Sequence, residues 1–326
     1  MRTIKKVASH IFIDGFGGMT QGLFATLIIG TMIQQIGLLI GGSTGNVIYL
    51  LGKAAAALTS AGIGVGVAVK YGESPLVTVS AAVAAMVGGY AGKITGGTFF
   101  VDGNAVLAGP GEPLGAFIAA FAGITCGHLV SGKTKVDIIV TPVITIGAGS
   151  VVGLLVGPPI SQMMTGLGSI INWATEQRPF IMGIVVSVVM GMVLTLPISS
   201  AALGIILNLS GLAAGAATIG CCCNMVGFAV ASYRENKFGG LVAQGLGTSM
   251  LQVPNIMRHP LIWLPVIFSS AILGPVSTIL ANMQNNATGS GMGSAGLVGQ
   301  ITTYQTMITY DCLLYTSPSP RDGATS

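Results

Sequence analysis

Glu112 is the acidic residue of this chain whose sequence surroundings best suit chemistry. It stands in Gly109–Gly115, where the glycines permit positive φ and Pro113 disfavours helical dihedrals at the residue before it. A carboxylate can accept hydrogen bonds from hydroxyl groups, or take a proton from a hydroxyl that acts as a nucleophile. Long apolar runs, Pro75–Ala91 and Leu114–Val130, flank this stretch. Glu112 is therefore a predicted catalytic residue.

A second carboxylate and several neutral amides complete the set of candidate site residues. Glu176 follows a weakly apolar piece, Ile160–Ala174, and is the other predicted catalytic residue. Amide side chains both donate and accept hydrogen bonds, which matches a ligand rich in hydroxyl groups. Those in or near breaks of the apolar runs are predicted to bind substrate: Asn208, Asn224, Gln244, Gln252 and Asn255. This mixture suits a neutral polyhydroxylated solute better than an ion.

The histidines and cysteines show no spacing typical of a metal or redox site. His10, His128 and His259 are scattered, and no pair among the five cysteines has zinc or redox spacing. Cys221–Cys223 lie inside an apolar run, so we predict that they are small packing residues. We expect no metal and no cofactor.

The composition predicts that these residues belong to a membrane protein. Charged residues make up 7% of the chain and hydrophobic residues 52%, and the mean hydropathy is +0.82. A soluble domain has about 25% charged residues. The apolar runs are long and continuous, which favours helices over a barrel, and the 50 glycines favour close helix packing. The net charge of +4 is too diffuse to indicate a nucleic-acid partner.

We therefore predict an all-α polytopic membrane protein, with about 8–10 transmembrane helices and with broken or re-entrant segments. The expected spans are Thr20–Ile40, Val47–Val69, Pro75–Ala91, Leu114–Val130, Val136–Val156, Phe180–Leu196, Leu212–Ser232, Leu261–Asn282 and a last one that begins at Leu297. Gly157-Pro158-Pro159 is expected to end the fifth span. Ile160–Ala174 is then a short span, a re-entrant hairpin or an interfacial helix.

The bilayer gives Glu112 two alternative interpretations. An ionisable group in irregular backbone at membrane depth marks a functional site. A loop residue at the level of the lipid headgroups would instead be unremarkable.

The basic residues predict the topology, because loops rich in Lys and Arg stay in the cytoplasm. The expected cytoplasmic residues are Arg2, Lys5, Lys6, Lys70, Lys133, Lys135, Arg234 and Lys237. This arrangement requires Ile160–Ala174 to dip into or cross the membrane.

The sequence changes character at Asp311. Residues 1–310 are predicted to form one transmembrane domain, whereas residues 311–326 fit neither a span nor an ordinary loop. We expect this last stretch to be a foreign or disordered tail that replaces the native C-terminus.

Several motifs resemble one family of transporters. They are Gly111–Phe117, Ser131–Asp137, Leu194–Ala202, Tyr233–Asn236 and Gln244–Asn255. Together they look like the enzyme IIC membrane proteins of the bacterial phosphotransferase system, and the nearest group is the stand-alone IIC branch that includes perfringolysin-regulator-like proteins. The resemblance extends over essentially Met1–Tyr310.

The resemblance implies a sugar permease in the bacterial cytoplasmic membrane that forms a homodimer. Such a protein passes its sugar to a separate IIB subunit, itself phosphorylated by IIA, and would be an enzyme only together with IIB. An intramembrane acid is expected near the reactive sugar hydroxyl, and Glu112 and Glu176 both remain candidates for it. Two alternatives stay open: a membrane-embedded regulator built on the same fold, and an ion-coupled secondary transporter.

Overall fold

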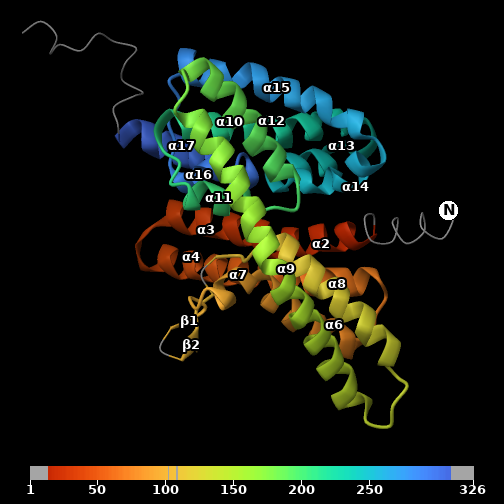
Figure 1. Ribbon diagram of the computed structural model, residues 1–326. Coiled ribbons are helices and arrows are strands. Elements are labelled where there is room, and N and C mark those ends of the chain that lie inside the picture. Colours follow the sequence, from red (N-terminus) through yellow and green to blue (C-terminus); the bar gives the residue numbers. More distant parts are fainter. Residues whose placement is uncertain (1–13, 102, 108, 310–326) are drawn as a thin grey trace, which may run out of the picture.

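The computed structural model describes residues 14–309 except 102 and 108, and this part of the chain is almost wholly helical (Figure 1). Among the described residues, five helices are long and apolar enough to cross a membrane, or six if one bent pair forms a single span. Two shorter apolar helices accompany them. The predicted all-α polytopic membrane fold is confirmed. Arg2, Lys5, Lys6 and the predicted tail lie outside the described residues.

The helices form two lobes, and the first contains the described residues from 14 to 130 (Figure 1). The helices of this N-terminal lobe are α2 (Phe16–Leu23), α3 (Ile29–Ile40), α4 (Gly42–Ala57), α5 (Thr59–Lys70), α6 (Pro75–Gly89), α7 (Ala91–Thr95) and α8 (Pro113–Val130). A π-helical segment, Phe24–Ile28, joins α2 to α3. The predicted span Val47–Val69 is not straight, because α4 and α5 meet at an angle of 53°.

Small residues let α6 and α8 approach closely. Ala81, Ala85, Gly88 and Gly89 are buried, as their spacing on one face predicts. A Cβ atom added at Gly88 would collide with the carbonyl oxygen of Gly115. Backbone contact of this kind is typical of transmembrane helix pairs that are held together by van der Waals packing.

A loop joins α7 to α8 and includes a short antiparallel hairpin of β1 (Phe100–Val101) and β2 (Asn104–Ala105). The hairpin residues are exposed and project from the N-terminal lobe (Figure 1). After the hairpin the chain returns to the lobe and delivers Glu112 to the start of α8.

The long helix α9 (Asp137–Thr175) connects the two lobes (Figure 1). It begins against α8 and ends in the second core, where Ile171 and Ala174 are fully buried. The predicted break at Gly157–Pro159 is wrong, because the helix continues through Pro158 and Pro159. Prolines are tolerated inside transmembrane helices because neighbouring groups satisfy the carbonyls that they leave without a donor. Ile160–Ala174 is therefore not a separate segment.

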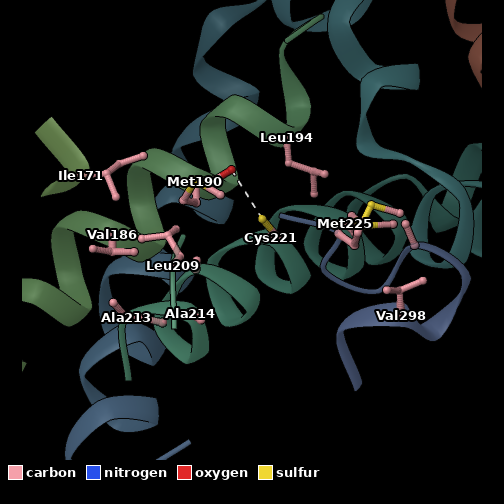
Figure 2. Close-up of a cluster of buried hydrophobic side chains, with 14 of the residues drawn as sticks. Ile171, Val186, Met190, Leu194, Leu209, Ala213, Ala214, Cys221, Met225 and Val298 are labelled. Carbon is pink, nitrogen blue, oxygen red and sulfur yellow. Dashed lines mark hydrogen bonds between the residues drawn. The ribbon is translucent and has the colours of Figure 1, made fainter. Parts of the chain in front are cut away.

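The C-terminal lobe contains the remaining helices around a second core. They are α10 (Pro179–Thr195), α11 (Ser200–Ile206), α12 (Gly211–Ala231), α13 (Tyr233–Val242), α14 (Val253–Arg258), α15 (Leu264–Pro275), α16 (Ala287–Ser290) and α17 (Val298–Thr309). Short π- or 3₁₀-helical segments join some of them: Ala243–Gly247, Ser249–Gln252, Pro260–Trp263, Val276–Leu280 and Ala295–Leu297. Figure 2 shows the core, where the Cys221 thiol donates to the Met190 carbonyl at 3.5 Å.

Helices α10 and α12 run parallel, which requires the chain between them to turn back. Ser187 approaches Gly220, Met190 contacts Cys221 and Thr195 contacts Asn224, so residue numbers rise together along the two helices. Because α10 and α12 are parallel, both begin on the same side of the lobe. Residues 196–210, including α11, therefore form a return segment, in agreement with the predicted broken or re-entrant architecture.

Candidate functional site

Glu112 lies where the two lobes meet. It is the N-cap residue of α8, in extended conformation, and its backbone N–H donates to the Gly89 carbonyl at 2.7 Å. Its carboxylate oxygen Oε1 accepts a hydrogen bond of 3.4 Å from the backbone N–H of Ser199. Ser199 belongs to the turn that follows α10, so this bond joins the N-terminal lobe to the C-terminal lobe.

Glu112 also lines a cavity of about 650 Å³ between the lobes. The walls come from α6, α7, the stretch before α8, the second half of α9, and α11. The polar side chains in the lining are Lys93, Glu112, Ser169 and Asn172, and glycines and aliphatic residues form most of the rest. A concave, largely apolar space with a few polar groups is the usual form of a small-molecule site.

Burial changes the acid–base properties of Glu112, which directly precedes the span Pro113–Val130. Loss of solvent raises the pKa of the Glu112 carboxyl to about 7, against the opposing effect of the Ser199 N–H. A pKa near the working pH allows a carboxylate both to take up and to return a proton. Burial also lowers the pKa of Lys93, the other charged side chain among the described residues of the lining.

Breaks in four helical regions meet beside Glu112. A second, much smaller cavity of about 40 Å³ is lined by residues of these breaks. They come from the π-helical segment after α2, the turn at Ile198–Ala201, the turn at Gly247–Thr248, and the stretch Gly291–Ala295. Pro113 and Ser199 also line it, so Glu112 stands between the two cavities. Non-helical backbone buried inside a membrane protein is typical of transporter binding sites.

The comparison with known protein families gives the decisive observation. The family model described as "Phosphotransferase system, EIIC" matches residues 13–317. This chain belongs to the EIIC family. It is thus a multi-pass membrane protein and a permease component of a phosphotransferase system, whose family implies a sugar substrate and IIB and IIA partners. No curated protein matches the chain in sequence.

The match shows that the chain belongs to the family, but it does not assign the chain to one branch of that family. The stand-alone branch stays a prediction. The matched range also extends past Tyr310, so the boundary of the predicted tail stays a prediction too.

Asn224 of this EIIC protein lies away from the large cavity and is fully buried. Its Nδ2 donates to the Gly220 carbonyl at 3.1 Å and to the Ser270 hydroxyl at 3.2 Å. Its Oδ1 accepts from Trp263 Nε1 at 3.1 Å and from Thr195 Oγ1 at 3.2 Å. Both ends of the amide therefore hold helices of the C-terminal lobe together.

Gln244, Gln252 and Asn255 form one chain of hydrogen bonds. Asn255 Nδ2 donates to Gln252 Oε1 at 2.9 Å, and Gln252 Nε2 donates to Gln244 Oε1 at 2.9 Å. Gln244 Nε2 then donates to the Ser232 hydroxyl at 2.8 Å. The structure thus brings these three predicted residues together, but none of them lines the large cavity.

The two remaining candidates lie at exposed helix ends. Glu176 is the exposed C-cap residue of α9 and is absent from the lining of the cavity. Asn208 follows α11 with a φ of +47°, a left-handed conformation that asparagine adopts more readily than most residues. Of the predicted site residues, Glu112 is the one that reaches the cavity.

Sequence reasoning missed Lys93, Ser169 and Asn172, which line the cavity with Glu112. In the sequence, Lys93 is only the first residue of a connection between two apolar spans, and its position there does not indicate a site. Ser169 and Asn172 lie in Ile160–Ala174, whose weak hydropathy left its structure open. Two polar positions three residues apart on α9, Ser169 and Asn172, would have been a signal only once α9 was known to be continuous.

Proposed function

We propose that this chain is the IIC permease of a phosphotransferase system that binds a neutral sugar in the cavity between its lobes. One observation carries the proposal: a carboxylate with a raised pKa, Glu112, faces that cavity in a protein of the EIIC family. The unprotonated carboxylate accepts hydrogen bonds from sugar hydroxyls. It is also able to take the proton of the hydroxyl that attacks a phosphoryl donor.

The other cavity groups complement a hydroxyl-rich ligand. Lys93 supplies hydrogen-bond donors, whereas Asn172 and Ser169 can donate and accept. The aliphatic and glycine walls leave room for the carbon faces of the sugar ring. In this proposal Asn224 and the Gln244–Gln252–Asn255 chain stabilise the C-terminal lobe and do not contact the sugar.

The proposal extends to location and partners. The protein works in the bacterial cytoplasmic membrane, surrounded by lipid, as a homodimer. Separate IIA and IIB proteins deliver the phosphoryl group, because Glu112 is a base and not a phosphoryl carrier.

Sugar uptake tests the proposal. Cells that produce the protein with candidate IIA and IIB partners are supplied with a panel of radiolabelled neutral mono- and disaccharides. We expect uptake of at least one sugar, with appearance of its phosphate ester. Glu112→Gln should reduce this uptake to near background while the protein remains folded and membrane-inserted.

Glu176→Gln is the matched control, because it neutralises a carboxylate that is exposed and outside the cavity. We expect uptake at the wild-type level from it. Normal uptake by Glu112→Gln, or loss only in Glu176→Gln, would remove Glu112 from the mechanism.

A further inference from the structure

The stretch that carries Glu112 is fastened to the N-terminal lobe at three backbone positions. The Tyr90 hydroxyl donates to the Gly109 carbonyl. The Ser60 hydroxyl donates to the Pro110 carbonyl at 2.9 Å. The Glu112 N–H donates to the Gly89 carbonyl at 2.7 Å. Loops usually lack such a dense set of anchors to neighbouring helices.

We propose that Ser60 and Tyr90 are positioning residues, which hold the Gly109–Gly111 stretch so that the Glu112 carboxylate faces the cavity. The inference rests on the proposed function, because it concerns the same carboxylate. Neither side chain belongs to the lining of the large cavity, so both act through the backbone of the stretch and not on the ligand.

Ser60 has the stronger geometric support. It is fully buried in the first turn of α5, directly after the 53° bend between α4 and α5. Its hydroxyl fills the space in which a Cβ atom at Gly89 or Gly111 would lie. Gly111 also has a φ of +76°, which disfavours any other residue. Ser60 therefore contacts both the helix and the loop to which Glu112 is bound.

Tyr90 binds the carbonyl that precedes Pro110, that of Gly109. It is the C-cap residue of α6, and its ring packs against Phe99 with a centroid separation of 5.4 Å. The Nζ atom of Lys93 lies 5.4 Å from the centre of the same ring. Tyr90 thereby connects the Glu112 stretch to Lys93, which also lines the cavity.

The consequence of releasing an anchor is specific. A loosened Gly109–Gly111 stretch lets water reach the Glu112 carboxyl. The pKa of this carboxyl should then fall toward that of a solvated glutamate. Among the described residues of the cavity lining, Lys93 is the other charged group, and the variants below leave it in place. A merely structural serine or tyrosine would alter stability and leave the titration of Glu112 unchanged.

Infrared difference spectroscopy of the purified protein in detergent measures this titration directly, without any sugar. The protonated carboxyl band that titrates with pH and disappears in Glu112→Gln belongs to Glu112. We expect its midpoint to lie at about 7 in the wild type. Ser60→Ala and Tyr90→Phe should each move the midpoint to lower pH.

Thr59→Val is the matched control. Thr59 is the neighbouring fully buried hydroxyl, but it donates to the Ala56 carbonyl of α4 at 2.6 Å and not to a carbonyl of the loop. It should leave the midpoint unchanged. If Ser60→Ala does not fold, as judged by size-exclusion chromatography, Tyr90→Phe decides the question alone.

An unshifted midpoint in a folded Ser60→Ala or Tyr90→Phe protein would overturn the proposal, as would an equal shift in Thr59→Val. Uptake measurements complete the test, because a misplacement of about 1 Å can reduce catalysis about 100-fold. We expect the maximal uptake rate to fall at least tenfold on this basis in Ser60→Ala, with no such loss in Thr59→Val. If the midpoints shift while Glu112→Gln transports normally, the positioning holds and the proposed role of Glu112 in transport fails.

Discussion

Ser199 and Glu112 are joined by a hydrogen bond from a backbone N–H to a carboxylate, although 86 residues separate them along the chain. The donor belongs to the turn after α10 and the acceptor precedes α8, so the bond crosses from one lobe to the other. A charged acceptor makes a stronger hydrogen bond than a neutral one. The contact between the lobes is therefore sensitive to the protonation state of Glu112.

The raised pKa of Glu112 makes the stability of the protein depend on pH. A carboxyl whose pKa rises from 4.5 to about 7 on folding stabilises the folded state fully below the lower value. That contribution is lost as the pH rises through the folded pKa. Glu112→Gln should therefore resemble the wild type in thermal stability at pH 4.5 and exceed it at pH 8. Thermal unfolding in detergent at the two pH values measures this, and a variant less stable at pH 8 would contradict it.

Asn224 should contribute to stability and not to sugar affinity. Asn224→Ala removes four hydrogen bonds and leaves the partly buried Trp263 N–H without its partner. Each unsatisfied buried group costs about 1–3 kcal/mol. We expect a clear decrease in melting temperature, measured by thermal unfolding without sugar. An unchanged melting temperature with weakened sugar binding would instead assign Asn224 to the site.

The amide chain offers an internal comparison between a buried and an exposed member. Gln252→Ala breaks the middle of the chain and leaves the buried Gln244 carbonyl without its donor, so a loss of about 1–3 kcal/mol is expected. Asn255→Ala removes an exposed end, for which a change within about 0.5 kcal/mol is usual. Chemical unfolding of both variants measures the difference. Equal losses of unfolding free energy in the two variants would mean that burial does not determine how much each amide of this hydrogen-bonded chain contributes to stability.

The close approach of α6 and α8 predicts a large effect from one methyl group. Gly88→Ala places a Cβ atom against the Gly115 carbonyl, so the helices must separate and the melting temperature should fall. Gly147→Ala is the matched control on α9, because no atom lies within 4 Å of its new Cβ. That variant should be neutral or stabilised by up to about 1 kcal/mol, since alanine favours helix over glycine. A stable Gly88→Ala protein would contradict the packing described here.

Topology is open to a direct test. Helix α9 is long and apolar enough to cross the membrane, so its two ends are expected on opposite sides. Helices α10 and α12 both begin on the same side of their lobe. Single cysteines at positions 135 and 234 of an otherwise cysteine-free variant should thus share one accessibility, the cytoplasmic one, and position 178 the opposite one. Labelling of position 135 by an impermeant reagent in intact cells would overturn this topology.

The sequence predicted the parts of this fold that hydropathy controls. Long apolar runs gave α8 and α12 nearly to the residue, and the small-residue face of α6 was correctly expected to pack. Hydropathy did not predict that α9 would pass through Pro158 and Pro159, because that depends on neighbouring groups satisfying the backbone. As a result, the predicted crossing by Ile160–Ala174 was unnecessary. The return segment at residues 196–210 supplies the change of direction instead.

The candidate site was predictable only where unusual backbone and a charge coincided. Glu112 met both conditions, and the structure places it at the cavity. The amides shared the polarity of a sugar site, but polarity alone does not say whether a partner is a ligand or another side chain. Asn224 and Gln244 have protein partners from segments far away in the chain or across a break, which no local pattern reveals.

The turn that supplies Ser199 also has a consequence for the order of events during synthesis. Its neighbour Ser200 donates to the Gly291 carbonyl at 2.6 Å, so this broken backbone is completed by residues made much later. A ribosome adds about 5–20 residues per second, which leaves the turn incomplete for several seconds after it emerges. During that interval the N-terminal lobe already has all its own helices. The nascent chain therefore holds the helices of the N-terminal lobe and Glu112 beside an unfinished partner lobe. The turn that carries Ser199 and Ser200 is complete only once Gly291 has been synthesised.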